Sequence, residues 1–549
     1  MPYLCCMRFV WRVAVSSFGV FLWAQSLTEA EQALSRENYD RVLSLTQQIL
    51  SAKPKELYAY YLQGQAYLGQ YRQLEEDDPR RALLLKNARE SFSASIAKNS
   101  KFAFGYIGLA EADLLAGATE SAKNHLAKAE EYGASEAKAL IEAARVYTLL
   151  GGKLGLDKAT LLLSKAKTKD PSNPAILRGL GDLWLQQNVL ELAIDNYQQA
   201  ATAEPQNPEN FYRLGLAYSK AKSYKDAAEA LRKAIELDPG FAPAYRELGE
   251  IYYLVQKYPQ AKENYQKYVM LRPELPARVR YATFLYLSKD YKAAIKEIQA
   301  VLKDTFSLTL QRLLGYSLVE DGQYEEGLKA LQLYFDRQKP EKVIAKDYAF
   351  YAKALDKVGK DSLAVVYYSK AIEKDPKLGA DLYPEMANAF NTLGRYKEAA
   401  AALEKAIQHT NALNHYYALG RIYYKLGQIE KDSTYFRKAI EAFSYVKDKK
   451  PDLVPVYTEL GRCHAMLDPE SQAGLAKPFY EKVVELAEAD RSKYANDLKE
   501  AYAYLGYYYY LKENFQKSYE AYTRLKELDP ENPQAAQALP YLESMLKKR

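Results

Sequence analysis

Cysteine and histidine are scarce in this 549-residue sequence, which contains three Cys and four His. Metal motifs need such residues close together, as paired cysteines or histidine-rich runs, and no such spacing is present. The histidines are scattered, at His125, His409, His415 and His464. Cys463 precedes His464, but adjacent residues on a helix point about 100° apart, so we interpret both as structural. We therefore expect no metal site and no cofactor.

Catalytic motifs are also lacking. The stretch GGKLGLDKAT at 151–160 has three glycines and a lysine but not the spacing of a phosphate-binding loop, and we place it in a turn between helices. The acidic run EEDD at 75–78 is interpreted as a solvated loop rather than a divalent-cation site. With no nucleophile elbow and no strand that leads into a glycine-rich loop, the sequence predicts that the chain is not an enzyme.

An excess of one charge sign is absent as well. Lys and Arg total 76 and Asp and Glu total 70, which leaves a formal net charge of +6. The hydrophobic content of 48% and charged content of 27% are those of an ordinary folded chain. Because no domain-scale basic excess is visible, we expect no nucleic-acid partner.

One uncharged apolar run, Val13 to Trp23, follows a short leader that contains Arg8 and Arg12. The run is too short to span about 30 Å of hydrocarbon. The pattern predicts a secretory signal peptide over residues 1–24, cleaved near Ala24. An uncleaved anchor is the alternative.

Two details of this leader bear on where the chain goes. Met7 is an alternative start, because the segment that follows it is a better-proportioned signal. Cys5 and Cys6 precede the apolar run, which is the wrong place for a lipoprotein acylation site. We therefore expect an exported protein of the periplasm or cell envelope, with no stable membrane span after cleavage.

Tyrosine is abundant, with 50 Tyr against 17 Phe and 3 Trp, and many of these residues belong to a repeat. Gly181, Gly215 and Gly249 are spaced 34 residues apart. Aromatic residues, alanines and prolines follow them at fixed offsets: Trp184, Tyr218 and Tyr252, then Ala193, Ala227 and Ala261, then Pro205, Pro239 and Pro273. Such a unit is two antiparallel helices that cross at the small residues, with proline ending the second helix.

At these residues the chain resembles the tetratricopeptide repeat (TPR) family. LGDLW, LGLAY and LGEIY carry the first half of its pattern, and AIDNYQQAATAEP and AAEALRKAIELDP carry the second. The resemblance covers nearly the whole chain after the leader. It implies an all-α fold, a right-handed α-solenoid of about fourteen TPR-like helix pairs, with the tail PQAAQALPYLESMLKKR as a C-terminal capping helix.

The regularity of the pattern divides the chain after the signal peptide. We expect degenerate N-terminal repeats over 25–172, a regular array over 173–306, its continuation over 307–451, and irregular repeats with the capping helix over 452–549. Clear units begin near Pro174, Pro208, Ala242, Pro276, Leu308, Ala345, Ala380, Leu413, Val454 and Lys499. No linker rich in Gly, Ser or Pro interrupts the array, but its phase slips near 302–307 and 447–451.

The resemblance also implies that positions 2, 5, 6, 9, 12 and 13 of each first helix line a concave groove. In that register arginines recur at position 5 or 6 with aromatic residues around them. We call this set the Arg–Tyr strip: Arg178, Tyr212, Arg213, Arg246, Tyr253, Arg280, Tyr281, Phe284, Arg312 and Tyr316. A second set comes later: Tyr417, Arg421, Tyr424, Arg462, Tyr507 and Tyr510.

Arginine presents a planar fork of donors that fits a carboxylate, and tyrosine gives rigid contact area with a polar tip. The Arg–Tyr strip is therefore a candidate site for an extended peptide with acidic groups. The alternative is that its arginines pair with acidic residues of neighbouring repeats, and Glu247 and Glu250 are near enough to do so. The family's Lys–Asn clamp for a chaperone C-terminus is not expected, because Arg178 and Asp182 hold its first two positions.

These observations predict a non-catalytic scaffold that binds proteins or peptides through the groove and assembles or maintains an envelope complex. The alternative function is a glycan- or peptidoglycan-binding solenoid, for which a tyrosine-rich groove is also suited. Sugars stack most often on tryptophan, however, and Trp184 is the only one within the repeats.

Overall fold

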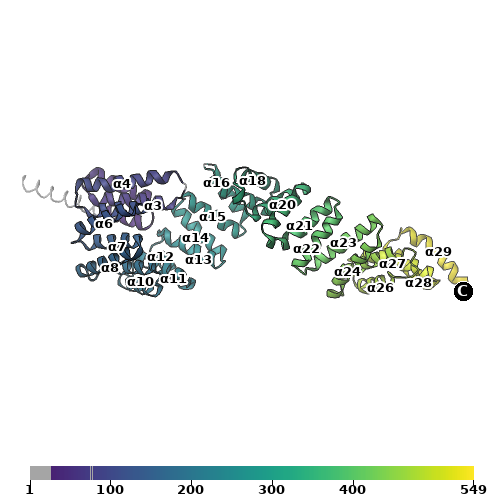
Figure 1. Cartoon of the computed structure of the whole chain (residues 1–549). Helices are drawn as coiled ribbons and strands as arrows, with labels where there is room; N and C mark the ends of the chain where they lie inside the picture. Colours follow the sequence, from purple (N-terminus) through teal and green to yellow (C-terminus); the bar gives the residue numbers. More distant parts are fainter. Residues whose placement is uncertain (1–25, 75, 77, 304, 549) are drawn as a thin grey trace, which may run out of the picture. The chain divides into compact units, whose positions relative to one another are not determined.

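The computed structural model describes residues 26–74, 76, 78–303 and 305–548 (Figure 1). The signal peptide predicted over residues 1–24 lies outside this part of the chain. Throughout these residues the secondary structure is helical, with short turns and no strand. The chain divides into two compact units, Met1–Phe306 and Ser307–Arg549, here unit 1 and unit 2.

Unit 1 begins its described part with helical residues 26–35, which pair with the next helix. The helices that follow are α2 (Tyr39–Ala52), α3 (Leu57–Gln73), α4 (Arg80–Lys98), α5 (Ala103–Leu115), α6 (Thr119–Gly133), α7 (Ala137–Leu150), α8 (Gly152–Lys169), α9 (Pro174–Gln186), α10 (Leu190–Ala203), α11 (Pro208–Lys220), α12 (Tyr224–Leu237), α13 (Ala242–Leu254), α14 (Tyr258–Leu271), α15 (Leu275–Leu287) and α16 (Tyr291–Leu302).

Unit 2 continues the pairing and adds three short 3₁₀ turns. Its elements are α17 (Leu308–Glu320), α18 (Tyr324–Arg337), η1 (Pro340–Lys342), α19 (Ala345–Lys357), α20 (Asp361–Lys374), η2 (Pro376–Leu378), α21 (Gly379–Thr392), α22 (Tyr396–His409), α23 (Leu413–Glu430), α24 (Ser433–Lys449), α25 (Val454–Leu467), α26 (Lys477–Ala487), η3 (Glu488–Asp490), α27 (Ala495–Leu511), α28 (Phe515–Leu528) and α29 (Pro533–Lys548). Over the described residues of both units this makes fourteen helix pairs and a final helix, which confirms the predicted fold class.

Close helix crossings at the small residues explain the repeat. A Cβ added to Gly249 would lie 2.5 Å from the ring of Tyr265 in α14, and one added to Gly215 would lie 2.7 Å from Leu231 in α12. Real Cβ atoms are not found so close to other atoms, so a larger residue would push the two helices of the pair apart. Ala261, on the second helix, is completely buried. The glycine and alanine positions are therefore the contact points of each pair.

The irregular units differ in helix length and turn length. Helices α23 and α24 have 18 and 17 residues, compared with 13 and 14 in α11 and α12. The turn between α25 and α26 runs from 468 to 476. Helix α27 begins at Ala495, one turn before the predicted start at Lys499, because the additional turn buries Leu498.

The placement of GGKLGLDKAT in a turn between helices is wrong. Only Gly151, with φ +66°, lies outside the helix, and α8 begins at Gly152. The physical reason is a close approach: a Cβ on Gly155 would lie 2.6 Å from the carbonyl oxygen of Tyr147 in α7. These glycines therefore allow the first turn of α8 to pack tightly on α7.

The final helix covers the last pair. Ala535 and Leu542 of α29 are buried and belong to the hydrophobic core that includes Leu525 of α28. Repeat arrays need such a cap because the apolar face of the last pair is otherwise exposed. Among the described helices, none combines the length and the apolar character that a membrane span requires.

Candidate functional site

The arginines of the Arg–Tyr strip all lie close to acidic side chains of the chain itself. Arg178 to Arg280 belong to unit 1, and Arg312 belongs to unit 2. The pairs are Arg178 with Glu204 (2.6 Å), Arg213 with Glu209 (2.8 Å) and Asp182, Arg246 with Glu37 (2.6 Å) and Glu247 (3.0 Å), Arg280 with Glu250 (2.9 Å), and Arg312 with Asp347 (3.9 Å). These contacts are the ones expected if the arginines pair with acidic residues of neighbouring repeats. Peptide binding by the strip stays a prediction.

A shared carboxylate recurs in this network. The Tyr265 hydroxyl donates to Glu250 (2.6 Å), and the same carboxylate accepts hydrogen bonds from Arg280 of the next repeat. Tyr197 and Arg213 meet at Asp182 in the same way. Burial, and then the nearby carboxylate, raise the pKa of Tyr265 above its ordinary value, so the hydroxyl remains a donor. The strip therefore ties consecutive repeats together.

The aromatic members of the strip pack against other side chains. Phe284 is completely buried, and the Arg280 guanidinium lies over the Tyr253 ring, 4.6 Å from its centroid. Tyr212 packs edge-on against Phe241. The two remaining members are Tyr281, half-buried on α15, and Tyr316, stacked on Phe350 with ring centroids 4.2 Å apart.

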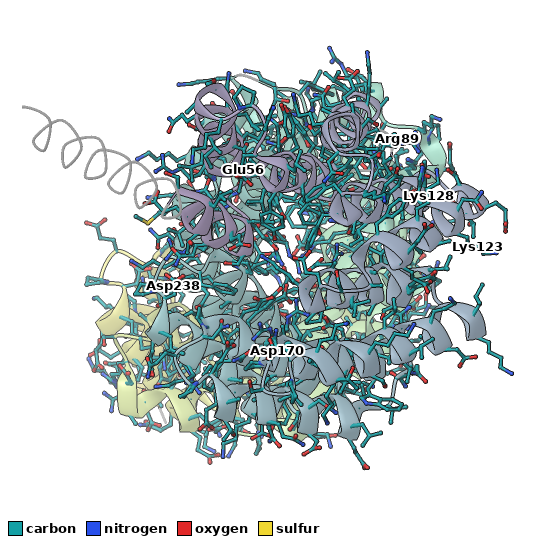
Figure 2. All side chains as sticks on the ribbon, turned by 90° about the vertical axis from the view of Figure 1, so that its left-hand side faces the viewer. Glu56, Arg89, Lys123, Lys128, Asp170 and Asp238 are labelled. Carbon is teal, nitrogen blue, oxygen red and sulfur yellow. The ribbon has the colours of Figure 1, made fainter. Side chains whose placement is uncertain are left out.

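The turn between helical residues 26–35 and α2 contacts the strip at Arg246 within unit 1. Arg36 donates to Asp238 (2.7 Å), Glu37 pairs with Arg246, and the Glu37 carbonyl accepts a hydrogen bond from Arg272. Figure 2 labels Asp238 on the side where the purple N-terminal helices lie. The 34-residue repeat pattern does not predict this contact, because about 200 residues separate the partners in the sequence.

In unit 2, two adjoining hollows lie between helices. One, of about 400 Å³, lies among α21, α22 and α23, and the other, of about 460 Å³, lies among α23, α24 and α25. They share Ala418 and Arg421 of α23. The first is lined by Ala387, Asn388, Asn391, Tyr396, Leu403, Ala418, Arg421, Ile422 and Lys425, and the second by Leu413, Asn414, Tyr417, Ala418, Arg421, Val446, Lys450, Leu453 and Pro455.

These hollows, which we call the Arg421 hollows, carry positive charge only. Arg421, Lys425 and Lys450 line them, and no acidic residue does. None of the three makes an ion pair within the described residues. Their donors are therefore available to an external acceptor, unlike those of the strip arginines.

The Arg421 hollows include part of the second predicted set. Tyr417 lines the hollow, with its ring 5.5 Å from that of Phe443. Arg462, in contrast, is bound to Glu500 (2.6 Å) and lies outside both hollows. Asn388 and Asn391 were not predicted, although they stand at positions 9 and 12 of their repeat, which the groove register already marked.

Cys463 and His464 lie side by side in the sequence of α25. Cys463 is completely buried, and burial raises the pKa of its thiol to about 12. His464 stacks on Phe479 with ring centroids 4.5 Å apart. No group of three or more His, Cys, Asp or Glu residues suited to a metal ion occurs in the described part of the chain.

Family profiles match helix pairs in both units. A tetratricopeptide repeat profile matches residues 208–241, a second matches residues 380–408 and 415–444, and a TPR repeat profile matches residues 181–222. A TPR repeat-containing protein of Methanocaldococcus jannaschii is 23% identical over 193 residues, which are 35% of this chain and 30% of that protein.

Solved structures of repeat proteins are also similar to parts of the chain. The C-terminal part of a TPR repeat-containing protein from Cytophaga hutchinsonii is 30% identical and covers 48% of this chain and 99% of its own, with a TM-score of 0.42. A tetratricopeptide repeat protein from Parabacteroides merdae is 18% identical and covers 44% of this chain and 93% of its own, with a TM-score of 0.30.

Proposed function

Because the chain belongs to the tetratricopeptide repeat family, we propose that it is a non-catalytic scaffold that binds proteins or peptides, and that the Arg421 hollows receive an acidic segment. The observation that carries this proposal is the set of three cations without ion pairs around an apolar floor. Leu413, Val446 and Leu453 supply that floor in the larger hollow.

The chemistry of the hollows fits a carboxylate on an extended peptide. Arg421 offers a bidentate fork, and the amides of Asn388, Asn391 and Asn414 can pair with the peptide backbone. The volumes of about 400 and 460 Å³ each accommodate a few side chains. Lys425 and Lys450 would add long-range attraction that falls as salt rises.

The test compares defined peptide pools. Degenerate acetylated nonapeptides with a fixed central Glu or a fixed central norleucine are labelled, and their affinity for the full chain is measured by fluorescence polarisation. We expect the Glu pool to bind more tightly, and Arg421→Ala to weaken it by about tenfold. Arg437→Ala is the matched control, because Arg437 of α24 is exposed and lies outside both hollows. Equal losses in the two variants, or no preference for Glu, would contradict the proposal.

The Arg–Tyr strip is the second protein-binding surface that we propose. A ligand there must compete with Glu250 and Glu37 for the guanidinium groups. The double change of Arg246 and Arg280 to Ala should abolish binding of the Glu pool if the strip is the main site. Binding that persists in this double variant and is lost in Arg421→Ala would assign it to the hollows.

We further propose that the chain acts in the periplasm or cell envelope, where it assembles or maintains an envelope complex. The basic leader and apolar run of residues 1–24 support this proposal. Periplasmic extraction of a Gram-negative cell that makes the full chain, followed by N-terminal sequencing, tests it. We expect the extracted chain to begin at Gln25, and a chain that stays in the cytoplasm with an intact leader would count against export.

A glycan-binding role is the second candidate function. Tyr507, Tyr510 and Tyr541 are exposed large aromatics, and the rings of Tyr510 and Tyr541 contact each other edge-on. Sugar rings pack their C–H faces on such surfaces. Retention of the full chain on insoluble peptidoglycan, and its loss in Tyr510→Ala, would support this function, whereas equal retention of both would argue against it.

A further inference from the structure

A larger hollow of unit 2 has the opposite charge. It measures about 760 Å³ and lies among α17, α19, α20 and α21. Its lining is Glu320, Ile344, Ala345, Lys346, Ala349, Phe350, Lys353, Tyr368, Asp375, Leu378, Asp381, Leu382 and Glu385. Four acidic residues stand against two lysines, which leaves a formal charge of −2. We call it the Tyr368 cavity.

The wall contributed by α21 carries two carboxylates, Asp381 and Glu385. Asp381 and Glu385 are four residues apart, on one face of the helix, and neither makes an ion pair within the described residues. Lys353 is engaged by Glu320 at 3.3 Å, and the Asp375 carboxylate accepts a hydrogen bond from the backbone N–H of Lys377, which leaves Asp381 and Glu385. Ala349, Phe350 and Leu382 line the cavity with apolar surface.

Tyr368 is the second, independent sign of a missing ligand. The residue is 1% exposed and lines the cavity, yet its hydroxyl has no hydrogen-bond partner in the described structure. Burial raises the pKa of Tyr368 above its ordinary value, and the nearby carboxylates of Asp356 and Glu385 add to that rise. A buried hydroxyl without a partner is destabilising, so such a group is rarely left unsatisfied.

The sequence explains why this hydroxyl lacks a partner. Tyr197 and Tyr265 occupy the same repeat position and donate to an acidic residue 15 positions earlier, Asp182 or Glu250. The residue 15 positions before Tyr368 is Lys353. Its ammonium group contacts Glu320 instead. Tyr368 therefore lacks the carboxylate that accepts a hydrogen bond from the hydroxyl of Tyr197 or Tyr265.

We propose that the Tyr368 cavity binds a basic side chain, lysine or arginine, of the protein partner. Asp381 and Glu385 would pair with its charge, the Tyr368 hydroxyl would accept one of its N–H donors, and its aliphatic stem would lie on Phe350 and Leu382. The inference rests on the proposed protein-binding function. It adds the side-chain class that this unit recognises.

The experiment uses the full chain and three labelled nonapeptide pools, with a fixed central Lys, norleucine or Glu. We expect the Lys pool to bind about tenfold more tightly than the norleucine pool, and Glu385→Gln to remove that preference. Glu373→Gln is the matched control, because Glu373 is an exposed acid of α20 outside the cavity. Tyr368→Phe, which keeps the ring and the fold, should weaken Lys-pool binding about threefold. Circular dichroism verifies that each variant folds.

The outcomes separate the two proposals. If binding of the Glu pool depends on Arg421 and the Lys pool binds no better than the norleucine pool, only the proposed role of the cavity is overturned. Failure of all three pools would overturn the protein-binding function itself. Retained Lys preference in Glu385→Gln would also overturn the inference. If spermidine saturates the cavity while the Lys pool stays unbound, the choice of a protein side chain as the occupant is overturned.

Discussion

The guanidinium group of Arg246 lies 2.6 Å from the carboxylate of Glu37, although 209 residues separate them in the chain. The contact joins the first turn of the described structure to helix α13. Arg272 strengthens it by donating to the Glu37 backbone carbonyl, and Glu37 itself holds φ +56°, a left-handed conformation that costs energy outside glycine. The N-terminal pair thus contacts the Arg–Tyr strip at Arg246, and an acidic ligand of Arg246 has to compete with Glu37.

Loss of this contact should release the N-terminal helix pair without unfolding the other repeats. Most contacts of a repeat are with its immediate neighbours, so the effect of Glu37→Ala should be confined to the N-terminal pair and the helices that it contacts. We expect it to destabilise residues 26–52 by about 1–3 kcal/mol, because it leaves Arg246 partly buried with a weaker partner. Hydrogen exchange measured by mass spectrometry should show faster exchange in those residues and little change in α9–α12. Arg232→Ala, at an exposed arginine of α12, is the control. Unchanged exchange in Glu37→Ala would show that the ion pair does not hold the pair in place.

The tyrosine hydroxyls offer a matched comparison of stability. Tyr265→Phe removes a hydrogen bond to Glu250 and should lower the free energy of unfolding by about 1–2 kcal/mol, since that bond is to a charged group. Tyr368→Phe removes a buried hydroxyl without a partner and should leave stability unchanged or slightly increased. Differential scanning calorimetry of the full chain measures both. Equal destabilisation by the two substitutions would mean that Tyr368 has a partner in solution, such as a bound water.

The fold could be predicted because the regular repeats carry the same few residue types at the same positions. Gly249 and Tyr265 have to fit together wherever two helices cross, so a 34-residue period in small and aromatic residues specifies the helix pairs. The candidate site was harder to predict from the sequence. An arginine at a groove position looks the same in sequence whether it is paired, as Arg280 is, or unpaired, as Arg421 is.

Two features of the site depend on relations that the periodic pattern does not contain. Glu37 reaches Arg246 through the three-dimensional curvature of unit 1, which a repeat period does not encode. The Tyr368 cavity depends on Lys353, which stands where Tyr197 and Tyr265 have an acidic partner, and this difference is informative only once those partners are known. Comparing equivalent positions across the repeats could have found the second feature from sequence alone.

Cys463 should be protected from thiol reagents in the folded chain. Burial raises the pKa of its thiol to about 12, so at pH 8 it stays protonated and out of contact with solvent. We expect no labelling of Cys463 by iodoacetamide at pH 8 in the native protein and full labelling in guanidinium chloride. Mass spectrometry of the peptide that contains Cys463 separates it from Cys5 and Cys6. Rapid labelling in the native state would reveal an opening of helix α25.

Glu111 should make unit 1 sensitive to acid. Its carboxylate is 1% exposed and accepts two hydrogen bonds of 2.7 Å from Arg145. Burial opposes its ionisation, but the guanidinium groups of Arg145 and Arg72 outweigh burial and hold its pKa well below the ordinary 4.5. A lowered pKa stabilises the folded state above the unfolded value, so this contribution is complete above about pH 5 and declines as the pH falls below 4.5.

The test is urea unfolding followed by tryptophan fluorescence, which Trp184 of α9 reports for unit 1. We expect the midpoint of the wild-type chain to fall between pH 5 and pH 3. Glu111→Gln should cost about 3–5 kcal/mol at pH 7, because Arg145 is left buried with a weaker partner, and its midpoint should change less with pH. Glu131→Gln, at an exposed acid of α6, serves as the control and should keep the wild-type pH dependence. The same steep decline in Glu111→Gln would assign the acid sensitivity to other carboxylates.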